Sequence, residues 1–109
     1  MTAIAYTVIA ETNSEATMRA YVDWLSSGHI RDVIEGGAQS ATLIRLDKSE
    51  DGMHRAEVRY VFGSRNAFEA YEAGPAMALR EDGIRLFGPQ SEHTIGFRRT
   101  LGGVVSVLP

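Results

Sequence analysis

The sequence predicts an α+β domain in which strands and helices follow the order β-α-β-β-α-β. Three observations predict it. Four segments have the β-branched, aromatic or alternating character of strands, and two segments between them have apolar residues at helical spacing. Glycine, proline and serine stand where each of these segments ends.

The first strand is predicted at residues 3 to 11, AIAYTVIAE, which is apolar on both alternating faces. Such a strand lies inside a sheet and is covered on both sides. Three residues compete to cap the helix that follows: Thr12, which forms a capping box with Glu15, and Asn13 and Ser14. The helix then places apolar residues on one face, at Met18, Tyr21, Val22 and Leu25.

The stretch WLSSGHIRDVIEGG, residues 24 to 37, interrupts this helix. Ser26, Ser27 and Gly28 break the helical pattern, which Ile30, Val33 and Ile34 resume. The double glycine Gly36-Gly37 supplies a left-handed stop. The stretch therefore predicts a helix, a break and a second short helix.

The second and third strands are predicted at residues 40 to 47 and 54 to 62. Alternation in the third places Ala56, Val58, Tyr60 and Phe62 on one face and Arg55, Glu57, Arg59 and Val61 on the other. A loop from Lys48 to His54 would pair Arg45 with Glu57. A tight hairpin at Asp51-Gly52 would pair Arg45 with Val58, and the sequence leaves both registers open.

The second half of the chain repeats the same pattern. Ser64 is expected to cap a helix with Ala67, Phe68 and Tyr71 on its apolar face, Gly74-Pro75 to break it, and Gly83 to end its second segment. The fourth strand is predicted at residues 91 to 99, and an apolar tail follows at 100 to 109. We therefore expect one ferredoxin-like domain over residues 1–109, with its core at 3–99 and two broken helices on one face of a four-stranded antiparallel sheet.

A sheet covered by helices on one face has a second face, and here that face is partly apolar. Another sheet packed over it would explain this pattern, and a chain of 109 residues leaves much apolar surface to cover. We therefore expect a homodimer that buries this face. Its predicted interface residues are Arg45, Glu57, Arg59 and Val61. The apolar tail is expected to lie against the partner subunit or against its own sheet edge.

Composition excludes several classes of function. The net charge of −3 provides no general attraction to nucleic acid or anionic lipid. The absence of cysteine excludes disulfides and thiolate chemistry, as expected in a reducing compartment. The sequence shows no signal peptide and no apolar run long enough to span a bilayer, so we expect a cytoplasmic protein.

A cluster of aromatic residues is the candidate ligand site. Its predicted members are Tyr6, Trp24, His29, Tyr60 and Phe62. A mostly apolar pocket with one polar group is typical of small-molecule sites, although such clusters also occur simply as core. His29 is the candidate catalytic base, because the N-terminal end of a helix favours a neutral imidazole; the alternative is a capping or boundary histidine.

No metal or cofactor is predicted. His29, His54 and His93 lie far apart, without a second ligand at metal-binding spacing, and the glycine pairs lack the context of a phosphate-binding or dinucleotide-binding loop.

The element order and length resemble the dimeric α/β-barrel superfamily, in which two ferredoxin-like subunits pack sheet to sheet. The segments YVDWL, SGHI, IRLD, VRYVF and SRNAFEAYE also resemble an uncharacterised bacterial family of about 100-residue proteins with this fold. The superfamily includes cofactor-free monooxygenases, haem-degrading enzymes and lactone isomerases. Its monooxygenases often carry an asparagine on the first strand, where this chain has Tyr6 and Thr7, a departure that argues against oxygenase activity.

Three functions follow from these observations. The first is a homodimer that binds a small apolar or aromatic molecule between sheet and helices. The second is a cofactor-independent monooxygenase or isomerase that uses the same cavity. The third is a structural or interaction subunit whose own side chains fill the cavity.

Overall fold

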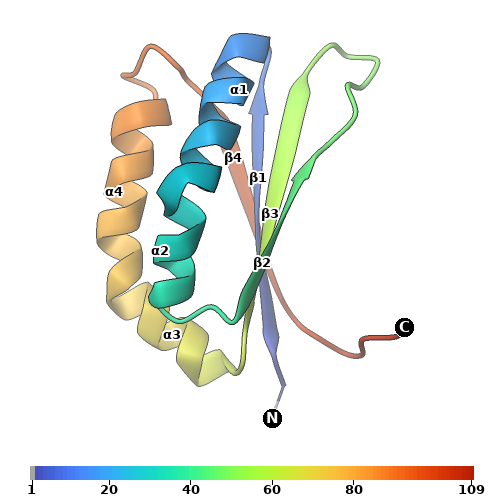
Figure 1. Ribbon diagram of the computed structural model, residues 1–109, viewed down its shortest axis with the longest axis vertical. Helices are drawn as coiled ribbons and strands as arrows, with labels where there is room; N and C mark the ends of the chain where they lie inside the picture. Colours follow the sequence, from blue (N-terminus) through green and yellow to red (C-terminus); the bar gives the residue numbers. More distant parts are fainter. Residues whose placement is uncertain (1) are drawn as a thin grey trace.

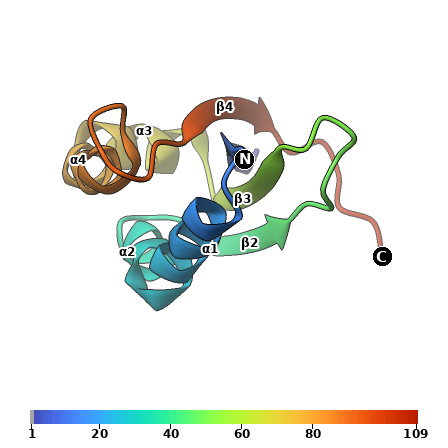
Figure 2. The ribbon, with the colours of Figure 1, turned by 90° about the horizontal axis from the view of Figure 1, so that it is seen from above.

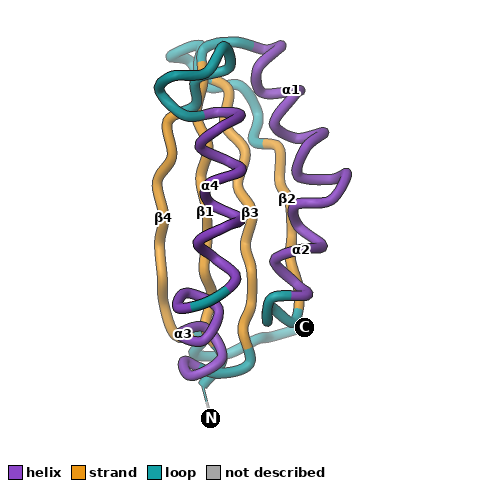
Figure 3. Tube along the Cα trace, turned by 90° about the vertical axis from the view of Figure 1, so that its left-hand side faces the viewer, coloured by secondary structure: helices purple, strands orange, loops and turns teal. Residues whose placement is uncertain are grey.

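The computed structural model describes residues 2–109 and contains a four-stranded antiparallel sheet with all its helices on one face (Figure 1). The strands lie in the order β2-β3-β1-β4, as the tube view shows (Figure 3). Their bounds are β1 Ile4–Thr12, β2 Ser40–Arg45, β3 His54–Phe62 and β4 Gly96–Gly103. The predicted α+β, ferredoxin-like arrangement is confirmed.

The helices form two broken pairs along that face. The first pair comprises α1 Glu15–Trp24, a π-helical turn at Leu25–His29 and α2 Ile30–Glu35. The second comprises α3 Arg65–Ala73 and α4 Pro75–Phe87. Seen from above, both pairs lie on one side of the sheet, so the opposite side has no helix (Figure 2). We call these two sides the covered face and the open face.

The pairing of the two central strands, β1 and β3, shows which residues lie on each face of the sheet. Their register pairs Tyr6 with Tyr60 and Val8 with Val58. These residues, with Ile4, Ala10, Ala56 and Phe62, lie on the covered face and form the sheet's side of the core. The intervening positions face the other way, so the predicted placement of Glu57, Arg59 and Val61 on the open face is confirmed.

The first helix is capped by one of the three residues that the sequence offers for this role. Ser14 is the N-cap and its Oγ accepts a hydrogen bond from the Thr17 amide at 3.1 Å, while Thr12 Oγ1 accepts one from the Ser14 amide. Met18, Tyr21 and Leu25 are buried, as their spacing predicts. The predicted break is a π-helical turn in which only Gly28 leaves helical geometry. Helices often carry such turns at functional sites.

The second helix pair is longer than predicted. Ser64 caps α3 and Pro75 starts α4, both as expected. The prediction that Gly83 ends the helix is wrong, because α4 continues to Phe87. The ring of Phe87 is buried against Tyr21 and Trp24, and this apolar contact holds the last turn in place.

The fourth strand starts and ends later than predicted. Residues 91–95 form a turn instead, in which Ser91 Oγ donates to the Gly88 carbonyl and the Ile95 amide donates to the Phe87 carbonyl. Ile95 is apolar because it is buried at this turn, and for that reason the sequence predicts the segment as part of the strand. The strand itself runs through Leu101, Gly102 and Gly103, which pair with Tyr6, Ala5 and Ile4.

The register between β2 and β3 differs from both predicted alternatives. Arg45 lies opposite Ala56, because the connecting loop makes its own turn, with the Gly52 amide donating to Ser49 and Asp51 accepting from Met53. Arg45 therefore lies on the covered face, and its predicted place beside Glu57 in the open-face network is wrong. The arginine that forms an open-face network is Arg55, which pairs with Glu11 at 2.6 Å and Asp51 at 2.7 Å.

The tail beyond β4 leaves the sheet on the side of the open face (Figures 1 and 2). Val104 still donates its amide to the Ala3 carbonyl. Val105, Val107 and Leu108 are 98%, 86% and 82% exposed, so their side chains do not lie against their own sheet edge. That part of the tail prediction is wrong for these residues in the single chain.

Within residues 2–109, no helix combines the length and apolar character needed to cross a lipid bilayer.

Candidate ligand-binding pocket

A cavity lies between the covered face and the two helix pairs. The sheet contributes Tyr6, Val8, Tyr60, Phe97 and Arg99, and the helices contribute the remaining walls, chiefly through Tyr21, Trp24, His29, Tyr71, Arg80 and Gly83. Its volume is about 70 Å³, several times the roughly 10–15 Å³ that admits one water molecule. The interior therefore leaves room for a small ligand beside its own side chains.

Aromatic rings form the wall at the π-helical turn. Trp24 packs against Tyr21 and Phe87, with ring centroids 6.1 and 5.3 Å apart. Tyr21 also meets the ring of Phe97 edge to face at 5.7 Å. Gly83 lies beside the indole, where a Cβ would be in ordinary van der Waals contact with Trp24 Cη2 at 3.5 Å. This wall offers ring faces and edges to a flat apolar ligand.

His29 reaches the cavity from the π-helical turn and stacks on Trp24, with ring centroids 4.1 Å apart and planes 22° from parallel. Its side chain makes no capping hydrogen bond, so it is not the predicted capping residue. Burial lowers its pKa below the usual value, against the opposing effects of Asp32 and Asp82. The imidazole is therefore neutral near pH 7, as predicted, but the cause is loss of hydration rather than a helix end.

The polar part of the cavity centres on the hydroxyl of Tyr6. This oxygen accepts hydrogen bonds from Arg80 Nη2 at 3.2 Å and from Arg99 Nε at 3.0 Å. Arg80 comes from α4 and is also paired with Glu72 at 2.7 Å. Two arginines from different elements thus converge on one phenol at the cavity wall.

The other tyrosines of the cavity are uncharged at every ordinary pH. Burial raises the pKa of Tyr21 and of Tyr60 well above their usual range, and it raises the pKa of Tyr71 to about 12. Their phenols remain protonated and can donate or accept hydrogen bonds. The fixed charges at the cavity are consequently those of the arginines and Glu72.

Four of the five predicted ligand residues line this cavity together: Tyr6, Trp24, His29 and Tyr60. Phe62 does not, because it lies two residues beyond Tyr60 and packs instead against Phe68 and Tyr71 in the core. Sequence reasoning missed Arg80 and Arg99. The sequence predicts Arg99 at the end of a strand, and the register of β4 pairs it with Val8 on the covered face, beside the cavity.

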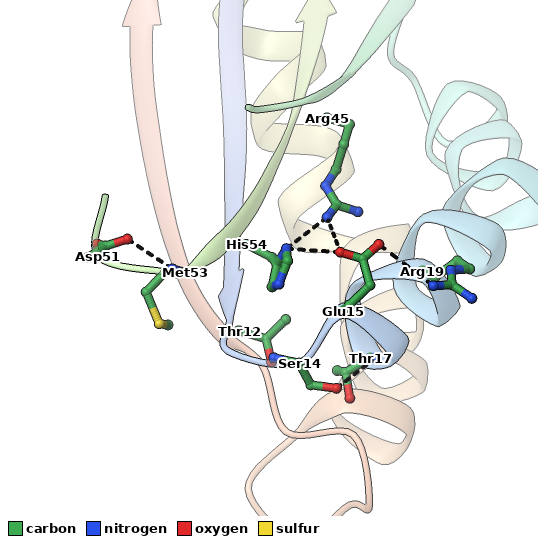
Figure 4. A network of polar contacts seen from close by, with 9 residues as sticks. All are labelled: Thr12, Ser14, Glu15, Thr17, Arg19, Arg45, Asp51, Met53 and His54. Atoms are coloured by element: carbon green, nitrogen blue, oxygen red, sulfur yellow. Dashed lines mark hydrogen bonds and ion pairs between the residues drawn. The ribbon is translucent and has the colours of Figure 1, made fainter. Parts of the chain in front are cut away.

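A separate polar cluster lies where α1 meets the ends of β2 and β3 (Figure 4). Arg45 Nη2 lies 3.2 Å from Glu15 Oε2 and 3.0 Å from Nδ1 of the buried His54, and Arg19 approaches the same carboxylate. His93 contacts Thr17 Oγ1 at 3.1 Å. These contacts fasten the start of α1 to the sheet.

The three histidines lie in separate surroundings. Within residues 2–109, histidine, aspartate and glutamate form no group of three or more that could hold a metal ion.

The fold and the cavity together define a ferredoxin-like α+β protein with a cavity between sheet and helices. The chain belongs to the family described as a domain of unknown function, DUF4286, whose model matches residues 3–104. Comparison with curated proteins gives no match.

Solved structures share this fold over nearly the whole chain. One is a dimeric ferredoxin-like protein from an uncultured marine organism, with a TM-score of 0.78, 15% identity, and coverage of 99% of this chain and 100% of its own. Another is a monooxygenase of Streptomyces coelicolor in complex with nanaomycin D, with a TM-score of 0.68, 18% identity, and coverage of 99% and 93%. A third is a mutant form of a cofactor-independent oxygenase from Streptomyces nogalater, with a TM-score of 0.61, 17% identity and 97% of both chains covered.

Proposed function

We propose that the protein is a homodimer that binds a small apolar or aromatic molecule in the cavity between its covered face and its helices. The observation that carries the proposal is the makeup of the cavity. Its lining combines aromatic rings from α1 and β4 with the hydroxyl of Tyr6 and two arginines. Small-molecule sites combine apolar walls with a few convergent polar groups in this way.

The size of the cavity limits the ligand. A void of about 70 Å³ is about half of the ~150 Å³ cavity that accommodates benzene, so even one ring with small substituents requires Trp24 or the α4 side chains to move aside.

Trp24 is the only tryptophan of the chain, and it provides the experiment. A panel of small neutral aromatic compounds, such as benzene, phenol and indole-free heterocycles, is titrated while tryptophan fluorescence is recorded. We expect saturable quenching or a spectral shift. The matched control is Gly83→Leu, which should fill the cavity beside the indole and abolish the response. A panel without any saturable response would contradict the proposal.

The homodimer is proposed to form through the open face. Ala5, Thr7, Arg59 and Val61 line a shallow hollow there, together with Val104, Ser106 and Val107 of the tail. A second copy would cover this hollow and the exposed tail residues by the same surface on both subunits. Fold neighbours described as dimeric ferredoxin-like proteins support this assembly. Glu57 and Arg59, 3.7 Å apart on β3, would then lie within the interface.

A second candidate function is cofactor-independent monooxygenase or isomerase activity in the same cavity. The fold neighbours described as oxygenases favour it, and the neutral imidazole of His29 supplies a base at the wall. Oxygen consumption with a small hydroquinone would test it, with His29→Ala and heat-inactivated protein as controls. If the wild-type protein consumes oxygen no faster than the controls, ligand binding remains the proposed function. If no compound binds either, the structural or interaction role remains.

The cytoplasmic location expected from the sequence stays a prediction, which fractionation of cells that produce the protein would test.

A further inference from the structure

The polar residues of the cavity carry more positive than negative charge. Arg80 and Arg99 both bring a positive charge to the hydroxyl of Tyr6. Arg80 has its counter-charge in Glu72, 2.7 Å away. The ion pairs among residues 2–109 include none with Arg99. One positive charge at the cavity wall is therefore left without a partner within this part of the chain.

The position of Arg99 is fixed by three contacts. Its strand pairs it with Val8, so that it projects from the covered face. Its Nε donates to the Tyr6 hydroxyl at 3.0 Å, and its guanidinium carbon lies 5.9 Å from the centre of the Phe97 ring. Nε is engaged with Tyr6, whereas the two terminal nitrogen atoms make no side-chain hydrogen bond or ion pair among residues 2–109 and remain available to a further partner. Such a fork matches both oxygens of a carboxylate.

Aromatic side chains line the same cavity as this charge. Trp24, Tyr21 and Phe97 would contact a single ring, which the void of about 70 Å³ admits only when neighbouring side chains move aside. A ligand with a flat apolar body and one anionic end would satisfy both sides together. A neutral ligand would leave the Arg99 charge unpaired.

On the basis of the proposed binding function, we infer that the ligand is a small aromatic carboxylate whose carboxylate pairs with Arg99 while its ring lies against Trp24. The inference names the ligand class of the pocket and gives Arg99 the role of the specificity-determining residue.

Benzoate and benzamide test this inference, because they have nearly the same shape and differ in charge. Each is titrated into the full-length protein at about pH 7.5, above the usual imidazole pKa, while Trp24 fluorescence is recorded, with isothermal titration calorimetry as a second measurement. We expect benzoate to bind about tenfold or more tightly than benzamide, as hydrogen bonds to charged groups imply. Arg99→Gln should remove this preference, so that the variant binds benzoate no more tightly than benzamide.

The matched control is Arg31→Gln, which removes the same charge from an exposed position on α2 outside the cavity. This variant should keep the full preference for benzoate. Circular dichroism and the unfolding midpoint of Arg99→Gln should match the wild type, since Arg99 lies in an edge strand with its side chain largely exposed.

Two results would overturn the inference. If benzoate has no advantage over benzamide in the wild type, or keeps its advantage in Arg99→Gln, Arg99 does not select an anion. In that case saturable binding of the neutral aromatic panel would still support the pocket. If neither these two compounds nor the neutral panel binds, both the inference and the proposed function fail.

Discussion

The two faces of the sheet differ in what covers them. On β3, Phe62 is fully buried on the covered face, whereas its neighbour Val61 is only partly buried on the open face. The covered face is packed by two helix pairs and encloses the aromatic cavity. The open face carries charged pairs, a valine and an apolar tail without a cover. One side of β3 therefore packs into the core of the subunit, whereas its other side remains partly exposed.

This difference shows which apolar residues a single subunit buries and which it leaves exposed. The covered face satisfies its apolar residues within one subunit, because α1 to α4 lie directly over it (Figure 1). The open face leaves Val105, Val107 and Leu108 in water, which is unfavourable by the same physics that buries Phe62. The tests below compare the two faces in order of decreasing expected effect.

The largest effect is expected at Phe62. Phe62→Ala should lower the free energy of unfolding by about 3–5 kcal/mol, because it removes a fully buried ring and leaves a cavity. Val61→Ala, one residue away on the open face, should cost well under half of this. Urea unfolding of both variants measures the difference. Equal losses would show that the two faces are equally well packed in the protein.

Val61→Asp should break the proposed dimer. A symmetric interface would bring two copies of the new carboxylate out of water, so we expect the dissociation constant to rise about a hundredfold. Sedimentation equilibrium across a range of concentrations measures it, with Asn66→Asp on the exposed end of α3 as a charge-matched control. If the wild type sediments as an 11.9 kDa monomer, the dimer proposal fails at once.

His29→Ala should weaken binding of the aromatic ligand by about 1–3 kcal/mol, because a polar group at the cavity wall and a ring stacked on Trp24 are lost. Titration by Trp24 fluorescence measures the change. An affinity unaffected by the substitution would remove the π-helical turn from the site.

His29 should also make stability depend on pH. Its pKa in the folded protein is lowered by burial, so the unfolded chain binds the proton more tightly. The contribution of His29 is therefore fully present above about pH 6.5, the usual imidazole pKa, and is lost as the pH falls through that value toward the folded pKa. Unfolding measured at about pH 7.5 and about pH 5, on either side of that pKa, should show a smaller loss in His29→Gln than in the wild type. A loss of the same size in both would assign the pH dependence to other groups.

The smallest effect is expected from removal of the tail, which should weaken association more than it weakens the subunit. A chain ending after Val104 keeps β4 and the Val104 hydrogen bond to Ala3 but loses three exposed apolar side chains. We expect the dimer dissociation constant to rise about tenfold, which is about 1.4 kcal/mol. The double variant Val105→Ser with Val107→Ser keeps the length and should have a similar effect. An unchanged constant in both would place the tail outside the interface.

The order of the elements, the capping role of Ser64 and the face of each residue on β3 follow from the sequence alone, whereas the sequence leaves three candidates for the first helix cap. These are local properties, set by the alternation of side chains along a strand and by hydrogen bonds within one turn. The sequence also indicates that Tyr6, Trp24, His29 and Tyr60 lie together, because strand alternation and helical spacing direct all four toward the same interior. Their role as ligand residues is still a prediction.

The remaining features depend on how whole elements pack. The loop after Arg45 fixed a register that strand residues alone could not choose, and the burial of Phe87 carried α4 past Gly83. The pairing of β4 with β1 places Arg99 beside Tyr6, so that a charge from the last strand meets one from α4 at a single phenol. Such contacts join residues 74 and 93 positions apart, and no local periodicity encodes them, because they form only when distant elements have docked on the same sheet.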